Sequence, residues 1–161
     1  MRIAVVGQIA RDLVLVVPEV PAAGGGTAVL ERREMVGGKG ANIARGTRQL
    51  GATVALVGVV GDDREGRLLV ERLDADGVAT TAVVCRGTTR TALIVDIVCD
   101  GRYRYLEDVP ERTLVTPADV RATAATLAGA DAVIVQLQQP ADAALAAVRA
   151  ARGLVVLDGA P

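Results

Sequence analysis

Short apolar runs that alternate with helical segments constrain the fold of this chain more than any other feature. The runs at residues 3–7 (IAVVG), 53–60 (TVALVGVV), 132–137 (AVIVQL) and 154–161 (LVVLDGAP) are rich in β-branched residues, as buried parallel strands are. Segments typical of helices lie at residues 39–50, 62–76, 116–130 and 140–153. Strands that alternate with helices predict an α/β fold built on a mostly parallel sheet.

Other apolar segments do not fit this alternation. Residues 12–17, 28–36 and 90–107 read as strands with no helix between neighbours, and the Asp-Gly pair at 100–101 predicts a hairpin turn inside the last of them. Residues 80–85 are expected to form one more strand. The segments at about 12–17, 28–36 and 90–107 therefore predict a small second sheet, placed as a lid on the main layer.

The composition bounds the core and the partners. The 161 residues suit one domain, and a hydrophobic content of 51% with two Tyr, no Phe and no Trp predicts an aliphatic core. A net charge of −1 without a basic block argues against nucleic-acid binding. The longest apolar run is too short to span a bilayer, and no signal peptide is evident, so we expect a cytoplasmic protein without a membrane partner.

The absence of histidine excludes Ser-His-Asp and Cys-His catalysis and most zinc sites. Proton transfer would therefore depend on carboxylates or on a lysine. Cys85 and Cys99 lie in apolar stretches, and their spacing matches no metal motif. We expect both to be small buried hydrophobic residues, and no metal site is predicted.

Lys39 is the one lysine among eighteen basic residues, and it lies in the segment GGKGAN at the start of a predicted helix. Gly37 and Gly38 let a ligand approach the backbone closely, and the N–H groups at a helix N-terminus suit an oxygen-rich ligand. Lys39 adds a compact charge with three donors, and Asn42 adds an amide one turn later. The group suits a polyhydroxylated ligand, although the spacing alone is equally compatible with a glycine-rich turn and a solvated lysine.

Two stronger phosphate-binding motifs are excluded at this segment. A P-loop requires Gly where Arg33 stands and Ser or Thr where Gly40 stands, and a dinucleotide fingerprint requires Gly where Ile43 stands.

The segment GGKGANIA, with LVGVVGDDREG downstream, resembles the first signature of the ribokinase-like, or PfkB, carbohydrate kinase family. The opening IAVVGQIARDLVLVV, the hairpin DGRYRYLE and the order from VTPADV to LVVLDGAP also resemble that family. The resemblance covers residues 1–161. It implies a three-layer α/β sandwich with a mostly parallel sheet and a β-clasp lid over the sugar.

Carried onto this sequence, the resemblance implies that Asp12 accepts hydrogen bonds from sugar hydroxyls, while Lys39 and Asn42 donate or bridge. The full set of candidate substrate-binding residues is Asp12, Gly37, Gly38, Lys39, Asn42 and Gln138. Ribose-specific members tend to carry Asn where this chain has Ala10 and an acid where it has Gln138. Because a site built for those hydroxyls loses selectivity without its partners, we expect an acceptor other than ribose, or ribose bound differently.

The family's second signature, similar to DTxGAGD, is not found in these residues. In the family its aspartate is the catalytic base and its glycine-rich turn forms an anion hole, so the resemblance places no catalytic residue in this chain. It also implies that ATP and Mg²⁺ are bound mainly by a C-terminal half. We expect an acceptor-binding part truncated before the nucleotide-binding half, inactive alone and exposing an apolar sheet edge.

The leading hypothesis is ATP-dependent phosphorylation of a sugar or related polyol, a small-molecule partner, with a homodimer possible through the lid strands. Two alternatives stay open: a nucleoside or sugar-phosphate kinase of the same family, and a non-catalytic sugar-binding or assembly module. The near absence of aromatic residues weighs slightly against a nucleoside, whose base usually stacks on a ring.

Overall fold

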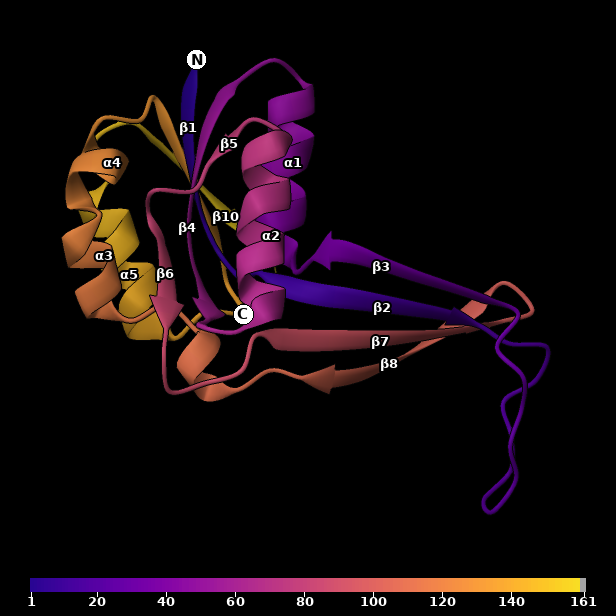
Figure 1. Cartoon of the computed structure of the whole chain (residues 1–161). Helices are drawn as coiled ribbons and strands as arrows, with labels where there is room; N and C mark the ends of the chain where they lie inside the picture. The colour runs from indigo at the N-terminus through magenta and orange to yellow at the C-terminus, as the bar shows by residue number, and fades with distance from the viewer. Residues whose placement is uncertain (160–161) are drawn as a thin grey trace.

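The computed structural model describes residues 1–159, which form two sheets (Figure 1). The main sheet has the strand order β10-β9-β1-β4-β5, and β6 pairs with a further stretch of β4. Each of these pairs is parallel, as the alternating pattern predicts. Its strands are β1 (Arg2–Val6), β4 (Thr53–Gly61), β5 (Val78–Ala79), β6 (Val83–Arg86), β9 (Ala132–Gln136) and β10 (Leu154–Asp158).

Helices cover both faces of the main sheet. In Figure 1, α1 (Lys39–Gln49) and α2 (Arg64–Ala75) lie on one side, and α3 (Pro117–Ala122), α4 (Ala124–Ala128) and α5 (Ala141–Ala150) lie on the other. A short 3₁₀ turn, η1 (Glu111–Thr113), precedes α3. The predicted three-layer sandwich is confirmed. Within residues 1–159, no helix combines the length and the apolar character needed to cross a membrane.

The core is aliphatic, as the composition predicts. One buried cluster joins the main sheet to α1 and α2, and a second joins it to α3, α4 and α5. Leu56 and Leu73 are fully buried in the first cluster, and Leu127 is fully buried in the second. Burying each of these side chains contributes about 1.5–3 kcal/mol.

The second sheet, called the lid sheet here, has the order β3-β2-β7-β8. Its strands are β2 (Ala10–Val16), β3 (Glu31–Gly37), β7 (Ala92–Cys99) and β8 (Arg102–Asp108). Strands β2 and β7 are parallel, whereas the two outer pairs are antiparallel. The lid sheet projects from the main body like an arm (Figure 1). The turn between β7 and β8 has positive φ at Asp100 and Gly101, as an Asp-Gly hairpin requires.

Several predicted boundaries need correction. The strand predicted at residues 28–36 begins only at Glu31, and the strand predicted at 80–85 begins only at Val83, as β6, after the short β5 has ended at Ala79. The helix predicted at 116–130 breaks at Thr123, whose hydroxyl donates to the carbonyls of Asp119 and Val120. Such back-bonding competes with the helical ladder. The last two residues of the predicted strand 154–161 lie outside the described residues.

The prediction for the cysteines is wrong for Cys85, which is exposed. Cys85 lies on β6, a strand that pairs with β4 along one edge only. Cys99 is half-buried at the end of β7, with its Sγ 3.5 Å from the Pro18 carbonyl oxygen. Both thiols are free.

One carboxylate connects the main sheet to the start of the lid strand β7. Asp63 caps α2 by accepting from the Gly66 N–H at 2.7 Å, and it also accepts from the N–H and the hydroxyl of Thr91 at 2.7 and 2.6 Å. Thr91 in turn accepts from the Gly61 N–H at 3.0 Å. The GDD portion of the motif LVGVVGDDREG therefore fixes where the lid sheet leaves the main sheet.

Candidate functional site

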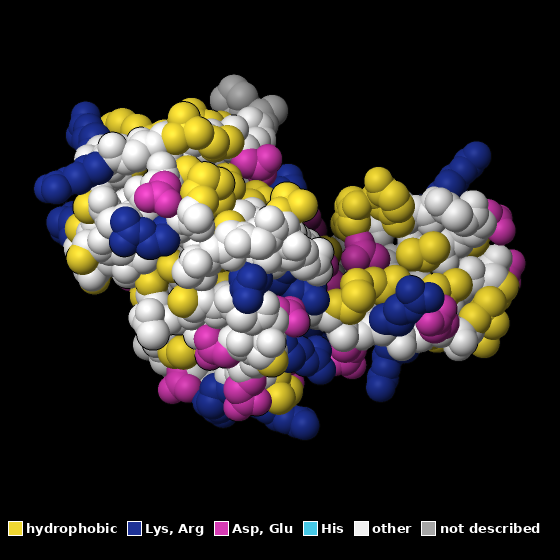
Figure 2. Space-filling model, turned by 90° about the horizontal axis from the view of Figure 1, so that it is seen from above, with side chains coloured by type: hydrophobic (Ala, Val, Ile, Leu, Met, Phe, Trp, Pro, Cys, Tyr) yellow, Lys and Arg dark blue, Asp and Glu magenta, His cyan; other side chains and the backbone are white. Residues whose placement is uncertain are grey.

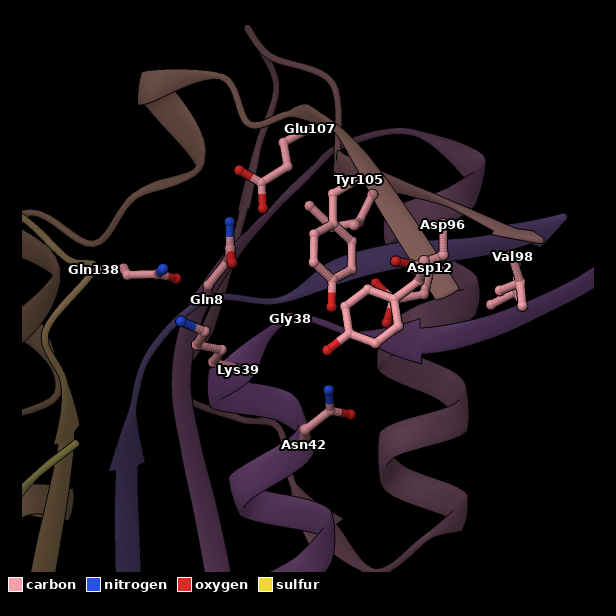
Figure 3. A pocket seen from close by; sticks show the side chains of 13 residues that line it. Gln8, Asp12, Gly38, Lys39, Asn42, Asp96, Val98, Tyr105, Glu107 and Gln138 are labelled. Atoms are coloured by element: carbon pink, nitrogen blue, oxygen red, sulfur yellow. The ribbon is translucent and has the colours of Figure 1, made fainter. Parts of the chain in front are cut away.

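A cavity of about 570 Å³ lies where the lid sheet meets the N-terminus of α1 (Figure 3). Its walls come from the end of β1, the start of α1, one face of the lid sheet and the segment after β9. It is lined by Gln8, Asp12, Val14, Gly38, Lys39, Asn42, Ile94, Asp96, Val98, Tyr103, Tyr105, Glu107 and Gln138.

The start of α1 contributes a charged and an amide side chain to the cavity. Gly38 precedes the helix with φ 82°, and a Cβ there would lie 2.7 Å from the Gln8 carbonyl oxygen. Only glycine fits this position without strain. No side chain caps the helix. Lys39 and Asn42 belong to its first turn and extend toward the cavity (Figure 3).

The lid strand β2 contributes Asp12, and Gly37 on β3 makes room for it. A Cβ on Gly37 would lie 1.9 Å from the Asp12 carboxylate carbon. Gly37 is buried and does not line the cavity. Its role in this geometry is to support Asp12, because any side chain at residue 37 would displace the carboxylate.

Asp12 and Asp96 form a pair of carboxylates on neighbouring lid strands. Burial and, to a smaller extent, the charge of Asp96 raise the pKa of Asp12, a backbone hydrogen bond from Gly38 opposes both, and the resulting pKa is about 6. Burial also raises the pKa of Asp96. One oxygen of each, Oδ1, is buried and has no hydrogen-bond partner within residues 1–159. Buried polar atoms usually have a partner, so both oxygens are available to a ligand.

The cavity has two ends of different character (Figure 3). At the main-sheet end, the Lys39 amine points toward Gln8 and Gln138. At the lid end, Asp12 and Asp96 lie beside the ring of Tyr105. The arrangement offers donors at one end and acceptors with aromatic surface at the other, which suits a ligand with several polar groups on a compact frame.

The structure brings together five of the six candidate residues found from the sequence. Asp12, Gly38, Lys39, Asn42 and Gln138 all line the cavity, and Gly37 lies beneath it. Ala10 is fully buried and is absent from the lining.

Sequence reasoning missed the contribution of β7 and β8. Asp96 on β7 and Tyr103, Tyr105 and Glu107 on β8 all line the cavity. The strand period of two was the available signal, because residues 103, 105 and 107 share one face of β8. Asp96 lies opposite Tyr105 in the sheet register, so locating one of them on the cavity face also locates the other.

The acidic side chains of residues 1–159 form no cluster that could surround a metal ion. Within residues 1–159, no group of three or more His, Cys, Asp or Glu side chains is placed to hold one.

Comparisons with known proteins agree with this architecture. Residues 1–152 match the model of the pfkB family carbohydrate kinase. The ribokinase of Bacillus subtilis is 30% identical over 139 residues, covering 86% of this chain and 47% of that protein. The ATP-dependent ribose-1-phosphate kinase of Halopiger xanaduensis is 30% identical over 154 residues, covering 94% of this chain and 50% of that protein.

A solved structure gives the same result for the fold. Arabidopsis thaliana ribokinase, complexed with ribose and ATP, superposes with a TM-score of 0.78 at 25% identity, covering 98% of this chain and 53% of that one. This chain therefore spans about half the length of these similar proteins. The family expected from the GGKGANIA segment is confirmed: the chain belongs to the pfkB family of carbohydrate kinases.

Proposed function

We propose that this chain forms the acceptor-binding side of an ATP-dependent kinase that phosphorylates a hydroxyl of a sugar or related polyol. The observation that carries the proposal is the convergence of Asp12, Lys39 and Asn42 on one cavity. These three residues come from a lid strand and from the first turn of α1, and their donors and acceptors suit adjacent hydroxyls.

The roles of the side chains follow from their chemistry. The ionised Asp12 carboxylate only accepts hydrogen bonds, so it orients sugar hydroxyls that donate. Lys39 and the Asn42 amide donate to sugar oxygens. Phosphoryl transfer depends on placing the attacking oxygen in line with the phosphorus, so these contacts act by positioning the acceptor.

The donor and the catalytic base belong, in this proposal, outside residues 1–161. No segment similar to the family's second signature occurs in the sequence, and no metal-binding cluster occurs within residues 1–159. We therefore assign ATP, Mg²⁺ and the base to the half of the relatives' length that this chain does not cover. Residues 1–161 alone are expected to bind the acceptor without transferring phosphate.

The proposed acceptor is not ribose held as in ribose-specific members. Ala10 offers no polar side chain, and Gln138 presents a neutral amide to the cavity where those members carry an acid. Ribose belongs among the tested acceptors, because the chain is 30% identical to a ribokinase. A strong preference of the natural full-length protein for ribose over other sugars and nucleosides would refute this part of the proposal.

Charge and aromatic content distinguish the two alternative acceptors. Asp12, Asp96 and Glu107 outnumber Lys39 in the lining, so the cavity repels a phosphorylated sugar. The low aromatic content of the sequence weighed slightly against a nucleoside. The chain's two aromatic residues, Tyr103 and Tyr105, both line the cavity, so a low aromatic content does not disfavour a nucleoside. Their rings offer a surface on which a nucleoside base could stack.

The test is phosphoryl transfer from ATP by the natural full-length protein to a panel of neutral sugars, amino sugars, nucleosides and sugar phosphates. We expect transfer to a sugar and a fall of at least about tenfold in kcat/KM for Lys39→Ala. Arg121→Ala, which removes an exposed cation on α3, is the matched control and should match the wild type. Sugar binding without any transfer would favour the non-catalytic module instead.

We also propose that two copies associate through the lid sheet. By strand alternation, the face opposite Asp12 and Asp96 carries several apolar side chains. Figure 2 shows hydrophobic side chains exposed among charged ones on the projecting sheet. Those on this face include Leu13, Leu15, Val95, Ile97 and Leu106. The same face also carries Arg32, Glu34 and Arg104, opposite Leu15, Leu13 and Ile97. Apolar side chains among charges of both signs suit a symmetric contact with a second copy.

The test of this association is sedimentation velocity on the natural full-length protein. Leu106 is 59% exposed, so Leu106→Glu should leave the fold intact and shift the protein from dimer to monomer. A wild-type protein that stays monomeric at high concentration would refute the dimer.

We place the proposed activity in the cytoplasm.

A further inference from the structure

Two carboxylates and two tyrosines form a distinct corner at the lid end of the cavity. We call Asp12, Asp96, Tyr103 and Tyr105 the acidic-aromatic corner. The tyrosine rings are neighbours on one face of β8, with centroids 5.0 Å apart and planes tilted by 45°. In the register, Asp96 lies opposite Tyr105, and Val98 lies opposite Tyr103.

The corner contains hydrogen-bonding capacity that the chain leaves unused. The Oδ1 atoms of Asp12 and Asp96 are buried, and within the part of the chain that the structure describes neither has a partner. Two acceptors of like charge at one site repel each other, and burial strengthens the repulsion by lowering the local dielectric. A ligand group seated there must donate hydrogen bonds and lower this repulsion.

No cation of the described chain neutralises the corner. Lys39, the one basic residue in the cavity lining, points toward Gln8 and Gln138 at the main-sheet end (Figure 3). Arg33 is on β3, and its guanidinium is bound to Glu31. The negative charge of the corner is therefore left for a ligand to offset.

We propose that the acceptor carries a protonated amino group, which binds between Asp12 and Asp96 with the tyrosine rings against it. This inference rests on the proposed kinase function and specifies its substrate class as an amino sugar or a related amino polyol. The hydroxyls of the same molecule would then lie toward Lys39 and Asn42.

An ammonium group fits this corner better than a hydroxyl does. It has three donors and a full positive charge, so it satisfies both free oxygens and removes their repulsion, whereas a hydroxyl donates one hydrogen and carries no charge. Tyrosine rings also attract cations over their faces. Val14 and Val98 line the same end and suit the carbon frame that carries the amine.

The experiment is calorimetric binding to the natural full-length protein with matched ligands. The probes are glucosamine, galactosamine and mannosamine, each compared with its parent sugar and with its N-acetyl derivative, which is neutral. We expect at least one amine to bind about tenfold or more tightly than both of its neutral counterparts, as expected when a charged group gains a charged partner.

Two variants identify the group responsible. Asp96→Asn keeps the shape and removes one charge, and it should abolish the preference for the amine while changing the affinity of the parent sugar less than about threefold. Asp100→Asn removes the same charge from the exposed turn of the lid hairpin and should leave the preference unchanged. Circular dichroism of both variants checks that the fold is retained.

Each contrary outcome overturns the inference. Equal affinity for amine and parent sugar, failure of every amine to bind, or an equal loss for both ligands in Asp96→Asn would reject the ammonium site. A nucleoside that binds more tightly than every amine, and loses affinity in Tyr105→Leu, would assign the corner to base stacking. In these cases ATP-dependent transfer to a neutral sugar or a nucleoside would leave a kinase function standing, whereas absence of transfer to every acceptor would reject both.

Discussion

The three hydrogen bonds of Asp63 make a sharp test of how the lid sheet is attached. The carboxylate accepts from Gly66 at the start of α2 and twice from Thr91 at the start of β7. Asp63→Ala removes all three and leaves a mostly buried threonine with unsatisfied donors. Asp62→Ala, one residue earlier, is the matched control, because the Asp62 side chain is exposed and, within residues 1–159, forms its one ion pair with Arg67.

The structure gives an order of magnitude for both variants. Loss of a helix N-cap costs about 1 kcal/mol, and each hydrogen bond to a charged group costs about 1.5–3 kcal/mol. Because the contributions share one side chain and water can reach the site, we expect a total of about 3 kcal/mol for Asp63→Ala. The Asp62–Arg67 ion pair has both side chains more than half exposed, so its loss should cost less than about 0.5 kcal/mol.

The same geometry predicts a pH dependence. Burial raises the pKa of Asp63, but hydrogen bonds from Thr91 and Gly66 outweigh it and hold the pKa below its usual value of 3.8. A carboxyl whose pKa is lowered by folding stabilises the fold above the unfolded-state pKa, and that stability is lost as the pH falls toward the folded-state pKa. The difference between wild type and Asp63→Ala should therefore shrink below about pH 4.

Urea unfolding followed by circular dichroism, at pH 7 and at pH 3, measures these differences in the free energy of unfolding. Tyrosine fluorescence gives an independent record of the lid sheet, because Tyr103 and Tyr105, both on β8, are the only aromatic residues. The reasoning fails if Asp63→Ala and Asp62→Ala lower the free energy of unfolding at pH 7 by the same amount.

Three further outcomes are expected. Burial and the charge of a second aspartate raise the pKa of Asp12 to about 6, so its ionisation weakens the fold as the pH rises from about 4 to about 6. Asp12→Asn should gain about 1 kcal/mol at pH 7, a value discounted for solvent screening, and little at pH 4 in urea unfolding. Gly37→Ala places a Cβ 1.9 Å from the Asp12 carboxylate and should weaken acceptor binding at least about tenfold in calorimetry. Gly46→Ala, with no atom within 4 Å of the new Cβ, should instead stabilise α1 by about 0.5–1 kcal/mol and leave binding unchanged. Residues 1–161 produced alone should self-associate through β10, where Leu154 is 66% exposed, and Leu154→Lys should reduce the sedimentation coefficient at high concentration.

The main sheet and its helices were predictable because the pattern of apolar residues in each segment indicates whether one face or both faces are buried. Residues 3–7 and 53–60 are apolar on both faces, and only a strand buried between two layers of helices satisfies that pattern. The break at Thr123 was not predictable from periodicity, since a threonine within an alanine-rich segment looks helical until its hydroxyl bonds back to the Asp119 carbonyl. The late start of β3 was not predictable either, because residues 28–30 have strand-like side chains but lie outside the strand, where the Leu30 N–H still donates to the Val16 carbonyl oxygen.

The cavity was only half predictable, and the reason is geometric. Lys39 and Asn42 were found through the glycine-rich motif, and Asp12 was found through the family resemblance. All three residues belong to segments with a distinctive sequence. Asp96 and Tyr105 belong to no motif, and each alone is typical of an ordinary strand residue facing solvent. Asp96 and Tyr105 become cavity residues because the strand register places them opposite each other. The face of the lid sheet that carries them turns toward α1. A sequence shows that residues 103, 105 and 107 share a face, but only the attachment of that sheet through Asp63 and Thr91 shows which face holds the ligand.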